Sequence, residues 1–187
     1  FYEGGKTLAV RKAMHLIVDG YNLIRQSDPF REAERVSLEE GRKALLRALA
    51  RYRKARRCKI TVVFDGWQSG SDREERDREE GVTAVYSRKG ERADEVIVRM
   101  AERKGEEIVV VTSDRAVAQA VESLGGTAVS SPDFALRLSM ASFPEEGGDG
   151  GDDTGDEDRT REGTKKKGPS RRLSRKKKEY LSRLKKL

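Results

Sequence analysis

Three apolar runs that each lead to an aspartate limit what this chain can fold into more than any other feature. Residues 16–18 lead to Asp19, residues 60–64 lead to Asp65, and residues 108–111 lead, three positions later, to Asp114. Short apolar runs bounded by turn-forming residues are typical of strands buried on both faces. Helical patterns separate the runs, so we predict a parallel sheet covered on both sides by helices, a three-layer α/β/α fold.

The remaining pattern predicts where the other elements begin and end. Ser37, with a glutamate three residues later, predicts the start of an amphipathic helix, and Ser131, followed by a proline, predicts the start of the last one. Helices are predicted over residues 37–57, 92–103, 115–124 (with Leu124 facing the core) and 131–140, and further strands over residues 82–86 and 127–130. The polar residues 21–34 and the charged residues 67–81 are predicted to be loops.

Composition divides the chain into four parts. Residues 14–143 hold almost all the strand and helix patterns and are predicted to be the folded domain, preceded by an extension over residues 1–13. Residues 144–170 are Gly-rich and largely acidic, so they cannot form a core, and we predict a disordered linker. Residues 171–187 hold nine bases and one acid, with leucines on one helical face, which predicts a basic amphipathic helix at the C-terminus.

Net charge and cysteine content restrict the partner and the compartment. The net charge of +7 favours a polyanionic partner. The one cysteine, Cys58, cannot form an internal disulfide and fits a reducing compartment. No apolar run reaches the ~20 residues that span a membrane. We therefore expect a soluble, cytoplasmic protein with no membrane span.

The three aspartates are expected to share one site. The carboxyl ends of parallel strands meet at one end of a sheet, where α/β proteins bind ligands, and Asp94 joins them if the helix over residues 92–103 begins there. Two carboxylates ~5 Å apart, at an effective dielectric constant of ~20, repel by about 3 kcal/mol. A divalent ion removes that cost. Oxygen-only ligands suit Mg²⁺ or Mn²⁺, which can stabilise a phosphodiester transition state and activate a water.

Each of these side chains also has an ordinary structural interpretation. Asp19 could form an Asx turn, Asp65 a simple turn, and Asp114 the N-cap of its helix. Asp94, in a first helical turn, could simply offset the helix dipole. Asn22 is either a turn residue or an amide that orients a phosphate or a water. From the residues alone these alternatives stay open.

Four motifs, in this order, resemble the NYN family of PIN-like nucleases, and most closely its bacterial YacP-like branch. They are Ile17–Ile24 (IVDGYNLI), Val62–Gly66 (VVFDG), Glu91–Ile97 (ERADEVI) and Val110–Arg115 (VVTSDR). The resemblance covers about Met14–Met140. It implies a PIN-like parallel sheet and metal-dependent RNA endonuclease activity, with links in this branch to mRNA decay and ribosomes.

The resemblance also implies roles for single residues. Asn22 corresponds to an amide that accompanies the metal cluster, and Glu95 is a weaker substitute for Asp94 because the next residue on a helix points about 100° away. The acidic metal cluster itself corresponds to Asp19, Asp65, Asp94 and Asp114.

Contacts with RNA are expected from an aromatic residue and several bases. Trp67 could stack on a base or anchor its own loop. Four bases near the aspartates either meet phosphates or are merely solvated: Arg88, Lys89, Arg92 and Arg115. The basic C-terminal helix is expected to bind RNA, including that of the ribosome, unless it is a solvated tail with no fixed partner.

Three functions remain open. We expect a metal-dependent endoribonuclease of single-stranded RNA, with mRNA, free or on the ribosome, as the substrate. The alternative is a non-catalytic RNA- or ribosome-binding protein whose acidic cluster is a relic. The third is a phosphatase or a DNA nuclease on a similar sheet, because no residue visibly reads a 2′-hydroxyl.

Overall fold

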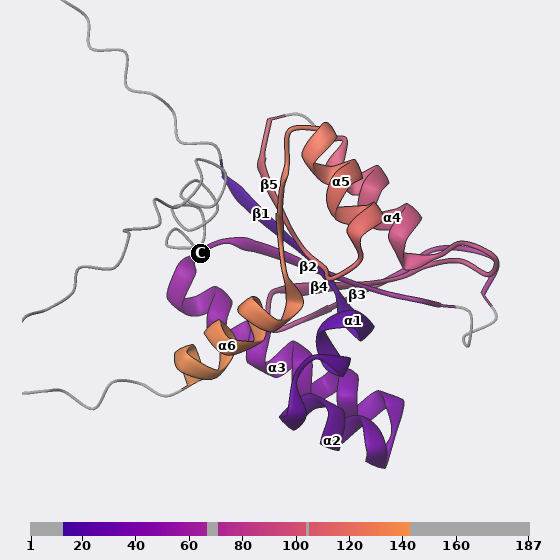
Figure 1. The fold of residues 1–187 in the computed structure, drawn as a ribbon. Helices are drawn as coiled ribbons and strands as arrows, with labels where there is room; N and C mark the ends of the chain where they lie inside the picture. The colour runs from indigo at the N-terminus through magenta and orange to yellow at the C-terminus, as the bar shows by residue number, and fades with distance from the viewer. Residues whose placement is uncertain (1–12, 67–70, 104, 143–187) are drawn as a thin grey trace, which may run out of the picture. The chain divides into compact units, whose positions relative to one another are not determined.

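The computed structural model describes residues 13–66, 71–103 and 105–142, and these residues form a six-stranded sheet in the order β3-β4-β2-β1-β5-β6 (Figure 1). The strands are β1 (Met14–Asp19), β2 (Lys59–Phe64), β3 (Glu75–Glu79), β4 (Val82–Tyr86), β5 (Glu107–Val111) and β6 (Thr127–Val129). Neighbouring strands are parallel except β3 and β4, which are antiparallel. The predicted three-layer α/β/α class is confirmed.

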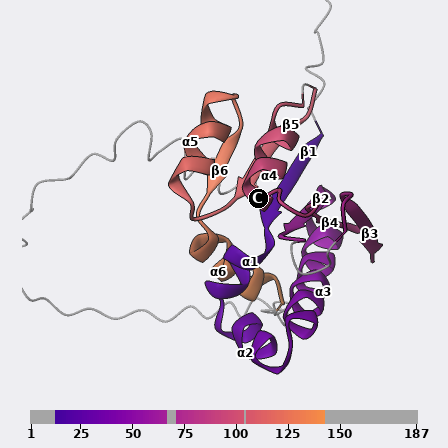
Figure 2. The same ribbon diagram turned by 90° about the vertical axis from the view of Figure 1, so that its right-hand side faces the viewer.

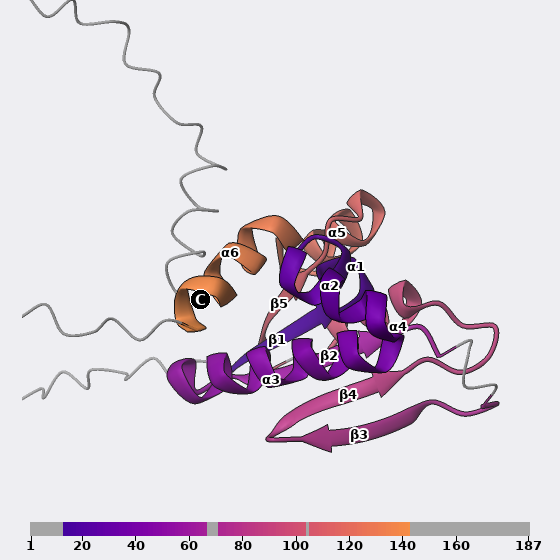
Figure 3. The same cartoon turned by 90° about the horizontal axis from the view of Figure 1, so that it is seen from below.

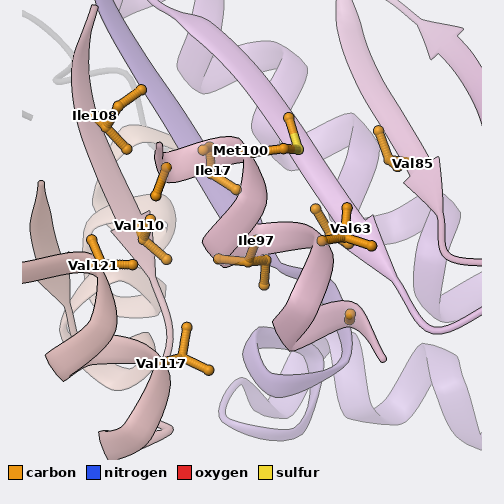
Figure 4. Packing of buried hydrophobic residues seen from close by; sticks show 12 residues of the cluster. Ile17, Val63, Val85, Ile97, Met100, Ile108, Val110, Val117 and Val121 are labelled. Carbon is orange, nitrogen blue, oxygen red and sulfur yellow. The ribbon is translucent and has the colours of Figure 1, made fainter. Parts of the chain in front are cut away.

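Helices cover both faces of the sheet (Figures 1 and 2). One face carries α4 (Ala93–Ala101) and α5 (Arg115–Ser123), and the other carries α1 (Gly20–Arg25), α2 (Asp28–Val36), α3 (Leu38–Arg56) and α6 (Ser131–Ser142). Under α4 and α5, alternate strand residues such as Ile17 and Val63 join Ile97 in a buried cluster (Figure 4). On the other face Tyr52 of α3 meets Phe134 of α6 edge to face, with ring centroids 5.3 Å apart.

Most predicted boundaries agree with the structure, and two details differ. Ser37 accepts a hydrogen bond from the Glu40 amide at 3.0 Å and caps α3 as predicted. Leu124 does not face the core: it lies past the last turn of α5 and is 45% exposed. The side chain that caps α6 belongs to Ser130, whose Oγ accepts from the Asp133 amide at 3.4 Å, whereas Ser131 is the first helical residue.

The loop predicted over residues 21–34 is wrong, because α1 and α2 occupy that segment. α1 begins where Asp19 accepts a hydrogen bond from the Asn22 amide at 3.1 Å. Pro29 lies in the first turn of α2, where its missing N–H costs no intrahelical bond. Phe30 then anchors α2 with 9% of its surface exposed. A proline that marks a loop in one context therefore starts a helix here.

The loop predicted over residues 67–81 is wrong in part, because β3 forms there along the edge of the sheet (Figure 3). An edge strand needs main-chain pairing but no apolar face, and charged side chains protect it from pairing with other chains. Glu80 (φ 47°) and Gly81 (φ 85°) make the left-handed two-residue turn that joins β3 to β4.

Several predictions fall outside the described residues. They are Trp67, the linker over residues 144–170, the basic tail over residues 171–187 and nearly all of the extension over residues 1–13. Within the described part of the chain, no helix is both long and apolar enough to cross a membrane.

Candidate functional site

Four aspartates from four elements lie at the carboxyl end of the parallel strands. Asp19 ends β1, Asp65 follows β2, Asp94 is the second residue of α4, and Asp114 caps α5. Repulsion between the negative charges reaches from Asp19 to Asp65 and Asp94, and from Asp94 to Asp65 and Asp114. The side chains that the sequence placed in one set therefore feel one another's charge in the fold.

Asp19 is the most deeply buried member, with 8% of its surface exposed. Its Oδ1 accepts from the Asn22 amide at 3.1 Å, and the Thr112 hydroxyl lies 3.5 Å from its Oδ2. Burial, with a smaller contribution from the charges of Asp94 and Asp65, raises the pKa of Asp19 to about 6, although the two hydrogen bonds oppose the shift. This carboxylate is held in place but poorly solvated, a state that a bound cation would relieve.

Asp65 positions the helix that carries Asp94. Its Oδ1 accepts from the Ala93 amide at 2.7 Å, so the end of β2 caps the first turn of α4. The pKa of Asp94, half-buried beside it, is raised by burial, then by the charges of Asp114 and Asp65. The residue after Asp65, Gly66, must be a glycine, because a Cβ there would lie 1.8 Å from the carbonyl oxygen of Ser87.

Thr112 links Asp19 to Asp114, and it was not among the site residues predicted from the sequence. Its hydroxyl oxygen accepts from the Asp114 amide at 3.1 Å while facing Asp19. Asp114 in turn caps α5 by accepting from the Ala116 and Val117 amides at 2.7 and 3.1 Å. A buried hydroxyl two residues before an aspartate at a strand end is the signal that could have identified Thr112.

Asn22 acts as a bridge between elements. Its Oδ1 accepts from the Ser113 amide at 3.2 Å and from the buried Ser131 hydroxyl at 2.8 Å. The side chain therefore ties α1 to the loop before α5 and to the start of α6. Neither sequence interpretation of Asn22, turn residue or phosphate ligand, included this tie across the strand ends.

An aromatic cluster borders the aspartates on the α3 face of the sheet. Tyr21 packs edge to face on Phe64 at 5.3 Å, and Phe64 stacks on Tyr86 at 5.6 Å. The Arg42 guanidinium lies 5.5 to 6.0 Å from all three ring centroids. Tyr21 thus fills space beneath the site, and nothing in the sequence pattern indicated Arg42.

The bases predicted to contact RNA surround α4 and α5. Arg88 pairs with Glu91 at 3.4 Å, and Lys89 and Arg115 are exposed. Arg92 and two of the aspartates line a groove of about 670 Å³ between the two helices: its lining includes Arg92, Asp94, Arg99 and Asp114. Glu95 turns back to accept from the Arg92 amide at 3.3 Å, so its carboxylate caps the start of α4, while its charge adds to the rise in the pKa of Asp94.

The chemistry of these donors fits a hard divalent cation, although the side chains do not stand as a formed metal site. Within the described residues, no group of three or more His, Cys, Asp or Glu side chains could hold an ion as positioned. Asp65 and Asp114 each use one oxygen on a helix amide and keep the other. Four oxygen donors that repel one another are the type of ligand that Mg²⁺ and Mn²⁺ prefer.

Known proteins resemble this chain in both fold and sequence. A solved structure of Rae1 (YacP) from Bacillus subtilis matches with a TM-score of 0.58 at 26% identity, covering 69% of this chain and 77% of that one; that structure is of a mutant. A second structure of Rae1 (YacP) gives 0.57 at 25% identity, covering 68% and 74%. The chain is also 30% identical over 102 residues to the uncharacterized protein YacP of Bacillus subtilis (strain 168).

The extent of these likenesses differs between comparisons. The YacP match covers 53% of this chain, and the chain spans only 59% of that relative's length. The family model described as YacP-like NYN domain matches residues 16–186. That match extends beyond Met140, where the resemblance was expected to end, and it includes the residues predicted to be linker and tail. Sequence and fold together show that the chain belongs to the YacP-like NYN domain family.

Proposed function

We propose that this protein is a divalent-metal-dependent endoribonuclease that cleaves single-stranded mRNA in the cytoplasm. The observation that carries the proposal is the convergence of four carboxylates, each fixed by its place on a strand end or helix start, at the end of the sheet where α/β proteins bind ligands. Family membership supports RNA as the substrate class.

Some of the residues would bind the ion, and others would hold those ligands in position. Asp19, Asp65, Asp94 and Asp114 would hold Mg²⁺ or Mn²⁺, and the bound ion would stabilise charge on the phosphodiester and lower the pKa of a water. Thr112 and Asn22 keep the carboxylates and the loop before α5 in position. Hydrolysis with water as nucleophile and the 3′ oxygen as leaving group leaves 5′-phosphate and 3′-hydroxyl ends.

Substrate would enter along the groove between α4 and α5. Arg92 and Arg115 lie at the starts of these helices, where their charges can meet RNA phosphates. The basic residues 171–187 would supply a second attachment, to mRNA or to the ribosome that carries it. Comparison of cleavage rates on naked and ribosome-bound mRNA tests the ribosome part of the proposal.

Asp94→Asn is the sharpest test of the active site, because Asp94 makes no hydrogen bond recorded among the described residues and its loss removes a charge without removing a helix cap. Glu95→Gln, the neighbouring acid on the same helix, is the matched control. With Mn²⁺ and a 5′-labelled single-stranded RNA, we expect Asp94→Asn to lower kcat at least 100-fold and Glu95→Gln to change it less than about threefold.

The outcomes separate the candidate functions. Equal cleavage by Asp94→Asn and the wild type would remove the proposed site. Binding of RNA by the wild type without cleavage under any divalent ion would favour the non-catalytic RNA-binding protein. Equal cleavage of a DNA strand of the same sequence would replace the ribonuclease assignment with a broader nuclease.

A further inference from the structure

A basic pocket lies at the end of the sheet opposite to the aspartates. Its volume is about 580 Å³, and it is bordered by the C-terminal end of α3, the first residues of β2 and β4, and β3. Five of its lining residues are bases and none is an acid: Arg53, Lys54, Arg57, Lys59 and Arg78, with Cys58, Gly81 and Thr83 between them. The groove between α4 and α5, in contrast, mixes bases with acids.

The charge of this pocket is only partly neutralised by neighbouring acids. Lys54 pairs with Glu80 at 3.4 Å and both side chains are exposed, whereas Lys59 pairs with Glu106 at 3.0 Å and the Glu106 side chain is only 28% exposed. No ion pair is made by the three arginines within residues 13–66, 71–103 and 105–142. Replacing the carboxylate of an exposed ion pair by another anion costs little free energy. The pocket therefore presents up to five cationic groups to a ligand.

The backbone shapes the pocket. Arg57 has a left-handed conformation (φ 52°, ψ 39°) that ends α3, and its amide donates to the Arg53 carbonyl at 2.8 Å. A left-handed residue other than glycine is disfavoured by about 1 to 2 kcal/mol. The backbone conformation alone would therefore favour glycine over arginine at this position. The Arg53 guanidinium also fits closely over Gly81, where a Cβ would lie 2.6 Å from its Nη1.

The helix dipole explains only part of the cluster. Bases in the last turn of α3 and at its C-cap offset the partial negative charge at that helix end, which accounts for Arg53 and Lys54 in the turn and Arg57 at the cap. It does not account for Lys59 and Arg78, which belong to strands β2 and β3. Three elements contribute bases to one concave surface, which is typical of a site for an anion with several oxygens.

We propose that this pocket binds phosphate groups of the RNA backbone and forms a second attachment site away from the aspartates. The lining is more polar than apolar, with five bases and no acid, and arginine forks match phosphate oxygens. The choice of RNA as the source of the phosphates rests on the proposed nuclease function. β2 separates the two sites by roughly 17 Å, so this pocket holds a different nucleotide from the one that is cleaved.

The test measures RNA binding to the full chain in EDTA, where no cleavage occurs, by fluorescence anisotropy of a labelled unstructured oligoribonucleotide at several salt concentrations. Arg57→Gly is the key variant, because glycine relieves the left-handed conformation while removing the charge. Its thermal midpoint should stay equal or rise, its RNA affinity should fall roughly 3- to 10-fold, and the slope of log K against log salt should shrink by about 0.7.

Two further variants complete the design. The pair Arg53→Gln and Arg78→Gln should weaken binding more than Arg57→Gly does. Arg47→Gln, an exposed base on α3 outside the pocket, is the control and should bind nearly as the wild type does. Equal affinity and equal salt slope for the pocket variants and the Arg47→Gln control would overturn the proposal.

A second arm identifies the source of the phosphate. Inorganic phosphate is added to the wild type and to the pocket double variant, and thermal midpoints are compared. Stabilisation of the wild type alone, together with RNA affinities that do not differ, would make the pocket a small-anion site and overturn the RNA assignment. The binding assay is made in EDTA and the nuclease assay in Mn²⁺, so a failed nuclease assay and a failed binding assay remain distinguishable.

Discussion

At the scale of single residues, the buried carboxyl of Asp19 makes stability depend on pH. Its pKa is about 6 in the folded protein, against 3.8 for the ordinary group, because burial disfavours the charge. Below about pH 4 the carboxyl is protonated in both the folded and the unfolded state, so its burial does not lower the free energy of unfolding. As pH rises towards 6 the unfolded chain ionises first, so the folded state loses stability, with the full cost present above about pH 6.

Asp19→Asn should therefore stabilise the metal-free protein at pH 7 by about 2 to 3 kcal/mol, and much less at pH 4. Asparagine keeps the acceptor for the Asn22 amide, so the cap of α1 survives. Urea unfolding in EDTA at pH 7 and at pH 4 measures the increase in the free energy of unfolding at each pH. A variant less stable than the wild type at pH 7 would contradict this account of the carboxyl.

Asn22 should contribute stability through its side-chain oxygen. Asn22→Ala leaves the Ser113 amide and the buried Ser131 hydroxyl without their acceptor, which should cost about 1 to 3 kcal/mol. Asn22→Asp keeps an acceptor at the same place and should lose less at a pH where Asp19 is protonated. Chemical denaturation of both variants measures the difference, and an alanine variant as stable as the wild type would show that the bridge is not made in solution.

At the scale of elements, Asp65 is a helix cap supplied by a strand, and two substitutions separate this role from ion binding. Asp65→Ala removes the acceptor of the Ala93 amide and should destabilise the protein by about 1 kcal/mol. Asp65→Asn retains an acceptor and should cost less than half of that. Both should lose metal-dependent cleavage, because neither keeps the negative charge.

Thermal unfolding and cleavage assays on the same preparations check this prediction. If Asp65→Asn unfolds as the alanine variant does, the hydrogen bond to α4 is not what Asp65 contributes. If Asp65→Asn cleaves RNA at the wild-type rate, Asp65 does not belong to the catalytic set.

The elements that could be predicted from the sequence are those whose own residues indicate whether each face of the element is buried or exposed. β2 and β5 contain the predicted apolar runs over residues 60–64 and 108–111, and the bounds of β4 are those predicted. β3 could not be found, because its pairing with β4 uses the main chain and leaves its charged side chains at the edge. α1 and α2 were missed because their helical starts depend on Asp19 and Pro29, residues that equally mark turns.

The same distinction holds within the candidate site. The aspartates end buried strands or begin helices, so their convergence followed from topology. Thr112 and Arg42 contact partners 93 and 22 positions away, respectively. The only local sign of Thr112 is a hydroxyl two residues before an aspartate, and Arg42 has no local sign. Sequence thus predicted the charged groups of the site, while the fold revealed the groups that hold them.

At the scale of the whole molecule, removal of residues 144–187 separates the nuclease from a binding module. Residues 14–142 form the six strands and six helices of the described fold, and we expect the shortened chain to unfold at a similar temperature. It should retain Mn²⁺-dependent cleavage of a short RNA with similar kcat, while KM should rise and its salt dependence weaken as bases are lost.

Steady-state kinetics on the shortened and full chains at two salt concentrations measure these changes. Loss of cleavage with the fold intact would place part of the active site in the removed residues, which the family match to residue 186 also covers.

The position of β1 also sets the order of events during synthesis. This first strand lies in the middle of the sheet, between β2 and β5, with His15 beside Lys59 on one side and Ile108 on the other. Pairing over such sequence separations is slow and cannot precede the arrival of the later strand. Asp19 is made early but finds Thr112 only after β5 has emerged, so a growing chain remains without its assembled acidic site until the sheet is nearly complete.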